Sequence, residues 1–349
     1  MGRAPTVHNN LPPRMRSRKQ RSGKVFYYYD TGLKPRKEIP LGCDYTTAVR
    51  KWSELHIING GTVSKLITFK EVSDRYVLEI VPTKAARTQK DNLHELTWLL
   101  KFFNNPPVPL DEIRPQHIRQ YLDWRGKSSH TRANREKALF SHIWNIARSW
   151  GLTDLPNPCI GIKGFSEKGR DIYIEDYIYD AVWQAADEPL RDALDLAYLT
   201  GQRPADTLAM SMTDIVDGAI AVQQEKTGKK LRIEIKGGLE SLLAKIADRK
   251  RGYAVHTLSI ICTERGQAMS MGSLRSRFEK ARARAAKDNP AIKAEIEAFQ
   301  FRDLRAKAGT DKAETGGMRA AQLQLGHSKM GMTEHYTRGR KGDKVTPTK

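Results

Sequence analysis

The sequence contains, in its carboxy-terminal part, Phe301-Arg-Asp-Leu-Arg305, then Leu325-Gly-His327, then Thr333-Glu-His-Tyr336. His327 lies 22 residues after Arg305, and Tyr336 lies 9 residues after His327. Two earlier stretches belong to the same series, Thr200-Gly-Gln-Arg-Pro-Ala-Asp206 and Glu225-Lys-Thr-Gly228. Any one of these residues alone would be read as a salt-bridge partner, a helix cap or a core side chain. Their order and spacing together indicate one site.

The chain around these stretches is predicted to mix helices with a β-hairpin. An apolar stripe from Leu190 to Tyr198 repeats at helical spacing and stops at Thr200-Gly201. Pro204 suits the first position of a new helix, so Arg203 is expected at a corner between two helices. Alternating residues predict strands at 219–223 and 231–235, with Lys226 at the tip of the hairpin. Further helices are expected at about 273–286, 290–298, 303–314 and 318–325.

The middle of the chain is predicted to be a separate helical domain. Apolar periodicity between residues 66 and 155 indicates helices at about 68–80, 88–103, 115–125 and 131–150. Gly60-Gly61 is expected to be the linker before this domain. Residues 155–164, which contain two prolines and two glycines, are expected to be the linker after it.

The amino-terminal region is predicted to be a small sheet with one helix. Residues 1–21 contain six basic residues, no acidic residue and three prolines, which favours an arm that only a partner would order. Strands are expected at 23–30 and 34–41, and a helix is expected to begin after an N-cap at Thr46 or Thr47. The domain boundaries predicted for the whole chain are 1–62, 63–160 and 161–349.

The overall charge requires a polyanionic partner. The chain has 349 residues, and 60 Lys and Arg against 40 Asp and Glu give a net charge of +20. No apolar run approaches the roughly 18 residues of a membrane span, and three scattered cysteines suggest reduced, cytosolic residues. No motif for nucleotide or metal binding stands out. This charge suits nucleic acid or an acidic membrane face. The series of residues quoted first favours nucleic acid, with no membrane and no metal.

The series Arg203, Lys226, Arg305, His327 and Tyr336 resembles the active-site pattern of the tyrosine recombinase, or phage integrase, family. That pattern is Arg, Lys, His-x-x-Arg, His or Trp, then Tyr. Five positions match by type, and Arg302 stands where the family usually has its first His. The resemblance covers residues 165–349. Residues 66–155 look like the family's core-binding domain, and residues 1–60 are similar to the arm-binding domains of temperate-phage and integrative-element integrases.

The resemblance implies a multidomain fold that is mainly α with α+β. It would comprise a small amino-terminal β-sheet arm domain, a helical (SAM-like) core-binding domain and a mixed α/β catalytic domain. It implies a site-specific DNA recombinase that cuts and rejoins DNA through a 3′-phosphotyrosyl intermediate and so integrates and excises a mobile element. The implied partners are double-stranded DNA at core and arm sites, further copies in a tetramer, a host DNA-bending protein and an excisionase. The implied location is the bacterial host's cytoplasm, at the nucleoid, and no cofactor is implied.

The residue types agree with phosphodiester chemistry. Charge develops on the non-bridging oxygens as the phosphorus is attacked, and fixed cationic donors stabilise that charge. Arg203 and Arg305 can each present a planar fork to these oxygens, and His327 adds a donor. Tyr336 would be the nucleophile, and Lys226 would protonate the leaving 5′ oxygen. Arg302 cannot accept a proton near neutrality, so we hypothesise that it acts electrostatically rather than as an acid or base.

Other basic residues are expected to contact the DNA backbone rather than to react. They are Arg16, Arg18, Lys19, Lys24, Arg132, Arg135, Lys229 and Arg232. Two alternatives stay open at this point. A type IB topoisomerase shares the same set of active-site residues, and a catalytically impaired DNA-binding or architectural relative would explain Arg302.

Overall fold

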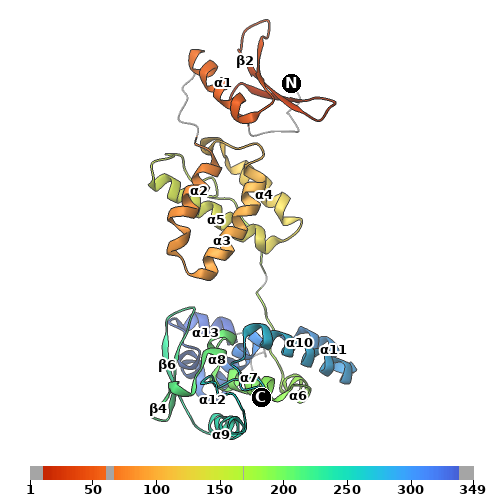
Figure 1. The fold of residues 1–349 in the computed structure, drawn as a ribbon, viewed down its shortest axis with the longest axis vertical. Coiled ribbons are helices and arrows are strands. Elements are labelled where there is room, and N and C mark those ends of the chain that lie inside the picture. Colours follow the sequence, from red (N-terminus) through yellow and green to blue (C-terminus); the bar gives the residue numbers. More distant parts are fainter. Residues whose placement is uncertain (1–10, 60–66, 168, 338–349) are drawn as a thin grey trace, which may run out of the picture. The chain divides into compact units, whose positions relative to one another are not determined.

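The structure is a computed structural model that describes residues 11–59, 67–167 and 169–337. The chain forms two compact units, Met1–Lys168 and Gly169–Lys349, each described here by itself. Elements of the first unit (Figure 1) are β1 (Met15–Lys19), β2 (Val25–Asp30), β3 (Glu38–Gly42), α1 (Tyr45–Ile58), α2 (Phe69–Glu79), α3 (Ala86–Phe103), α4 (Pro115–Gly126) and α5 (His130–Ser149).

The amino-terminal sheet is antiparallel, in the order β1-β2-β3. The prediction that residues 1–21 need a partner to become ordered is wrong for Met15–Lys19, which form β1. Met15 pairs with Tyr29 of β2 and is buried against Trp52 and the rest of a small apolar core. Helix α1 is capped by Asp44, not by Thr46 or Thr47, because the Asp44 carboxylate accepts a hydrogen bond from the backbone N–H of Thr47 (2.8 Å).

Helices α2 to α5 enclose an aromatic core. Phe69 stacks on Phe140 with ring centroids 4.8 Å apart, and Phe103 lies 5.1 Å from Phe140. The four predicted helices are confirmed, each beginning and ending within two residues of its predicted bounds. The linker predicted at 155–164 is wrong, because Cys159 is buried in this core and Ile162 packs against it. The glycines at 60 and 61 lie outside the described residues.

A buried ion pair fixes α4 against α5. Glu136 is fully buried and accepts hydrogen bonds from Tyr121 Oη (2.6 Å) and Arg125 Nε (3.1 Å). After α5 the chain returns along the same helices, and the Phe165 ring stacks on His130 with centroids 4.0 Å apart. A Cβ on Gly126 would lie 2.3 Å from that ring, so the close approach requires glycine there.

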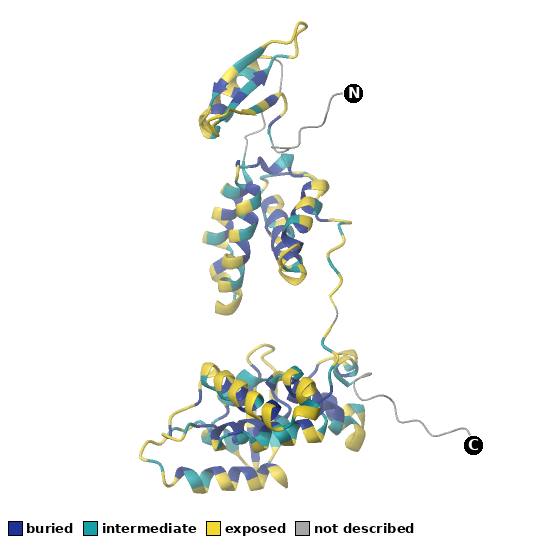
Figure 2. Ribbon diagram, turned by 90° about the vertical axis from the view of Figure 1, so that its right-hand side faces the viewer, coloured by how far each residue is buried: buried dark blue, intermediate teal, exposed yellow. Residues whose placement is uncertain are grey.

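The second unit combines helices with a small three-stranded sheet, in the order β4-β5-β6. Its elements are α6 (Asp176–Gln184), α7 (Glu188–Thr200), α8 (Pro204–Ala209), β4 (Ile215–Val216), β5 (Ala219–Gln223), β6 (Lys230–Glu234), α9 (Gly238–Lys250), α10 (Met271–Asp288), α11 (Lys293–Ala298), α12 (Leu304–Leu325) and α13 (Met330–Thr337). Buried residues follow the inward sides of these helices, and exposed residues follow the outward sides (Figure 2).

Most predicted elements of this unit are confirmed. The hairpin pairs Ile220 with Ile233, as its alternating pattern indicates, and α7 ends at Thr200. The two helices predicted at 303–314 and 318–325 are one segment, α12, kinked at Gly317, where φ is 78°. Helices α6 and α9 and the short strand β4 were not predicted. Within the described ranges, no helix is long and apolar enough to cross a membrane.

We predict that Glu136→Gln lowers the free energy of unfolding of the helical domain by about 3 kcal/mol, because it leaves the Arg125 charge buried without a counter-ion. The matched control is Asp123→Asn, which removes an exposed ion pair with Arg119 and should change stability by less than about 1 kcal/mol. Urea unfolding followed by tryptophan fluorescence measures both, since Trp98, Trp124, Trp144 and Trp150 all lie in this domain. Equal stabilities for the two variants would contradict the prediction.

Candidate active site

Arg203 lies at the corner between α7 and α8, as predicted. Gly201 ends α7 in the left-handed conformation (φ 66°), and Pro204 occupies the first turn of α8. Arg203 Nη1 donates to the side-chain oxygen of Gln224 (3.1 Å) and lies 3.6 Å from the Asp206 carboxylate. The guanidinium is therefore held from two sides, as expected of a group that must be placed before its ligand arrives.

Arg305 lies in the first turn of α12 and is only 3% exposed. Its Nη1 donates to the Gly201 carbonyl (2.9 Å) and its Nη2 to the Leu325 carbonyl (2.5 Å). Among the described residues, no carboxylate lies within ion-pairing distance, and the buried Nε has no hydrogen-bond partner. Burial, and then the charge of Arg203, lower the pKa of Arg305 to about 10. A buried cation without a counter-charge is costly, and an anionic ligand would offset the cost.

His327 follows Gly326, whose left-handed backbone (φ 68°) ends α12. Its Nε2 lies 3.2 Å from Arg305 Nη2, and its Nδ1 lies 3.0 Å from the Thr333 hydroxyl. Burial, and then the charges of Arg305 and Arg203, lower the pKa of His327 to about 4. The ring is therefore neutral at pH 7. Because Nε2 faces a donor, the proton is assigned to Nδ1.

Tyr336 lies on α13, one turn after Thr333, and is partly exposed. Its ring centroid is 5.1 Å from that of His327 and 5.9 Å from the guanidinium carbon of Arg305. The structure thus brings Arg203, Arg305, His327 and Tyr336 together from three separate parts of the sequence.

Two glutamines that were not predicted complete the site. Gln224 is buried, and its amide donates to the side-chain oxygen of Gln202 (2.7 Å) and to the Leu325 carbonyl (3.0 Å). Gln202 donates in turn to the carbonyl oxygens of Thr200 and Gln324. The signal available in the sequence was a polar residue at the inward position where strand β5 ends. These amides tie the α7–α8 corner to the hairpin and to the end of α12.

Lys226 and Arg302 are not brought into the cluster. Lys226 lies in the exposed β5–β6 loop, and Arg302 is exposed in the 3₁₀ turn Phe301–Asp303 that precedes α12. Asp206 contacts Arg203, and its other oxygen accepts from the Glu225 N–H (2.9 Å) at the start of the loop. Asp303 pairs with Arg170.

The residues predicted to contact DNA are all exposed. Three of them are paired with acids: Arg16 with Asp30 (3.0 Å), Arg18 with Glu38 (2.5 Å) and Arg232 with Asp217 (3.2 Å). The others are Lys19, Lys24, Arg132, Arg135 and Lys229. Exposed ion pairs of this kind are weak, so they do not prevent these arginines from binding phosphates.

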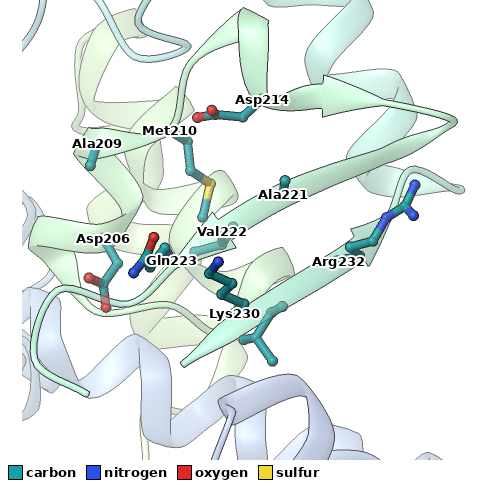
Figure 3. A pocket seen from close by; sticks show the side chains of 10 residues that line it. Asp206, Ala209, Met210, Asp214, Ala221, Val222, Gln223, Lys230 and Arg232 are labelled. Atoms are coloured by element: carbon teal, nitrogen blue, oxygen red, sulfur yellow. The ribbon is translucent and has the colours of Figure 1, made fainter. Parts of the chain in front are cut away.

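An open hollow of about 620 Å³ lies between α8 and the hairpin (Figure 3). Asp206, Gln223 and Lys230 gather at one end of it, and Arg232 lies farther along β6. Of the residues that line this hollow, Asp206 is the one that also contacts Arg203. None of the six predicted catalytic residues lines it, so this hollow is not the reaction centre. In the part of the chain that the structure describes, no group of His, Cys, Asp or Glu side chains is arranged to hold a metal ion.

Comparison with known proteins places this site in a family. Residues 175–342 match the model of the Phage integrase family. The integrase of Escherichia phage HK022 is 28% identical over 254 residues, which cover 69% of this chain and 68% of that protein. The integrase of Escherichia phage lambda is 27% identical over 251 residues, with the same coverage.

Solved structures show the same fold. A lambda integrase dimer bound to a COC′ core site superposes with a TM-score of 0.69 at 23% identity, covering 97% of this chain and 99% of that one. A lambda integrase tetramer bound to a Holliday junction gives 0.68 at 22% identity, with the same coverage. The Tn1549 transposon integrase gives 0.64 at 13% identity, covering 76% and 93%.

Residues 175–342, in the second unit, therefore form a domain of the phage integrase family, the tyrosine recombinases. Members of this family catalyse DNA cleavage and strand exchange. The predicted fold class and class of enzyme are confirmed, and neither the topoisomerase nor the non-catalytic alternative is favoured.

We predict that stability falls as the pH drops from about 6.5 to about 4, because the unfolded state protonates His327 and the folded state resists it. His327 should lower the free energy of unfolding by about 3 kcal/mol over this range. The decrease is absent above pH 6.5 and complete near pH 4. Urea unfolding at pH 7.5 and pH 4.5, compared between the wild type and His327→Gln, measures it. His335→Gln, in the exposed neighbour of Tyr336, is the control and should retain the wild-type pH dependence. A pH dependence unchanged in His327→Gln would refute the assignment.

Proposed function

We propose that this protein is a site-specific DNA recombinase that integrates and excises a mobile element, with Tyr336 as the nucleophile. The observation that supports this best is the buried Arg305 fork. It pairs with no carboxylate among the described residues, has Arg203 as a charged neighbour and lies beside the Tyr336 ring. Such an arrangement suits a phosphodiester, whose two non-bridging oxygens share one negative charge.

In the proposed step, Tyr336 Oη attacks the phosphorus and the bond to the 5′ oxygen breaks. A 3′-phosphotyrosyl bond forms, the phenol proton leaves to a base or to solvent, and the 5′ oxygen departs as a hydroxyl after taking a proton. Rejoining reverses the step, so the energy of the phosphodiester bond is kept in the protein–DNA link. This balance requires neither ATP nor a metal ion.

Arg203 and Arg305 would stabilise the charge that develops on the non-bridging oxygens. Each charge-assisted hydrogen bond contributes about 1.5–3 kcal/mol. The charges of Arg305 and Arg203 help to keep His327 neutral, and the phosphate charge would oppose their effect. DNA binding should therefore raise the pKa of His327 and favour its role as a donor.

Lys226 would reach the 5′ oxygen from the β5–β6 loop and act as the general acid. The loop is fixed at its start, where Gln224 accepts from the backbone N–H of Gly228 (2.8 Å) and Asp206 accepts from that of Glu225. Its exposed tip is free to meet a DNA backbone, and Lys229 and Arg232 would contact phosphates from the same hairpin.

The three predicted domains, 1–62, 63–160 and 161–349, would divide the DNA between them, with the second boundary moved to about residue 168. Arg16, Arg18, Lys19 and Lys24 would bind arm sites, and Arg132 and Arg135 at the start of α5 would bind the core site. The lambda integrase structures, bound to a core site and to a Holliday junction, support action as a tetramer. A host DNA-bending protein, an excisionase and a location at the nucleoid in the bacterial cytoplasm complete the proposal.

We predict that the wild type forms a covalent protein–DNA adduct with a nicked duplex carrying the candidate attachment site, and that Tyr336→Phe forms none. Tyr177→Phe is the matched control, since that exposed tyrosine on α6 only donates a surface hydrogen bond to Glu295 (2.5 Å) within the described part of the chain. Denaturing gel electrophoresis detects the adduct. If the wild type gave no adduct, the recombinase proposal would fail. A recombination assay with two sites then separates strand exchange from simple relaxation of supercoils.

We predict that Arg302→Ala slows cleavage by about tenfold or more, through loss of one charge-assisted contact. Arg302→His should restore the rate only at the acidic end of the pH range, where its ring is protonated. Arginine and protonated histidine both offer donors and charge, whereas only histidine can accept a proton near neutrality. Single-turnover cleavage between pH 6 and pH 9 measures both variants. Full activity of Arg302→Ala would show that Arg302 takes no part in the reaction.

A further inference from the structure

Helix α12 is attached to the beginning of its own unit by charged side chains that the proposed chemistry does not use. The segment Arg170–Asp176, here called the strap, leads into the first residue of α6 and runs beside the first turns of α12. It makes two attachments there, one on each side of Arg305 in the sequence.

The first attachment is a fork between Arg170 and Asp303. Arg170 Nε donates to Asp303 Oδ1 (2.7 Å), and Arg170 Nη2 donates to Oδ2 (2.6 Å). The same guanidinium hydrogen-bonds the Ala298 carbonyl at the end of α11. Asp303 is 4% exposed and also accepts from the backbone N–H of Gln300 (2.8 Å). A bidentate pair of this kind fixes orientation as well as distance.

The second attachment surrounds Lys307, which is 1% exposed and lies two residues after Arg305. Its Nζ contacts Asp176 (2.5 Å), the Tyr173 hydroxyl (3.1 Å) and Asp311 (3.3 Å). Tyr173 also donates to Asp311 (2.5 Å). A buried lysine paired with acids on both the strap and its own helix holds the two together.

Arg305 lies between these attachments, and it is held by backbone carbonyls from elsewhere in the unit, Gly201 and Leu325. Its guanidinium can meet those carbonyls, His327 and a ligand only if the first turn of α12 keeps its position. Two residues along a helix amount to about 200° of rotation, so Lys307 grips the side of α12 away from Arg305. The strap therefore braces the helix from behind the site.

We propose that Arg170 and Lys307 are positioning residues for strand cleavage, which act by holding Arg305 against the scissile phosphate. This inference rests on the proposed function. Because the strap begins where the second unit begins, it also links the position of Arg305 to the chain that arrives from the first unit.

The test uses the full chain and single-turnover cleavage of the nicked duplex. Arg170→Ala should slow cleavage by about 100-fold, since a misplacement near 1 Å costs about that much, while the Kd for DNA changes by less than about twofold. The matched control is Arg191→Ala, which removes an arginine that braces the carbonyls of Trp183 and Gln184 and should cleave at the wild-type rate.

A substrate with a neutral methylphosphonate at the scissile position separates positioning from general loss of stability. This group lacks the anionic oxygen that Arg305 meets, so loss of Arg305 costs less on it. If Arg170 acts through Arg305, the defects of Arg170→Ala and Arg305→Ala shrink together on this substrate. An Arg170→Ala defect of the same size on both substrates would overturn the proposal.

Milder variants keep the test decisive if Arg170→Ala fails to fold. Arg170→Lys keeps the charge and loses the fork, and Tyr173→Phe keeps the ring and loses the contacts to Asp311 and Lys307. Both should cleave the ordinary phosphate more slowly, with a smaller defect on the methylphosphonate. Wild-type rates for both would overturn the inference while leaving the proposed function intact. Absence of cleavage by the wild type would instead overturn the proposed function and the inference with it.

Discussion

The second unit is organised around a buried arginine that forms no direct ion pair with an acid in the part of the chain that the structure describes. Arg305 is almost fully excluded from water, and its donors go to two backbone carbonyls and a histidine ring. Taking a guanidinium out of water is costly, and a second arginine nearby adds repulsion. The folded chain tolerates this because α7, α12 and the hairpin hold the group rigidly from several sides. The same constraint leaves the site short of negative charge, which a phosphodiester provides.

The surrounding residues follow from that constraint. Gln202 and Gln224 satisfy the polar backbone atoms at the corner without adding charge, so they hold Arg203 and Leu325 in place and leave both arginines cationic. His327 is neutral because burial, and then the charges of Arg305 and Arg203, lower its pKa. The two nearby carboxylates have other partners as well: Asp206 lies beside Arg203 and also holds the start of a loop, and Asp303 pairs with Arg170.

Sequence patterns succeeded where the responsible forces are local. The four helices of the middle domain were predicted closely because their apolar stripes repeat at helical spacing and prolines or glycine separate them. The prediction that residues 1–21 need a partner to become ordered failed because Met15 pairs with Tyr29, fourteen residues away. Neither strand pattern nor charge reveals that contact. The prediction of a linker at 155–164 failed for a similar reason. Prolines and glycines favour turns, but a turn-rich segment can still bury Cys159 and pack Ile162 against the core.

The sequence by itself determined which residues are available for the chemistry, because order, spacing and residue type are properties of the chain. Arg203, Arg305, His327 and Tyr336 were proposed in this way, and all four lie within the stretch that matches the family model. The tertiary structure decided their states. Burial and the close approach of two arginines set the pKa values of Arg305 and His327, and the same packing leaves Lys226 and Arg302 on the surface. Dielectric environment and the distance between charges arise only when segments a hundred residues apart are brought together, so no pattern along the chain could have supplied them.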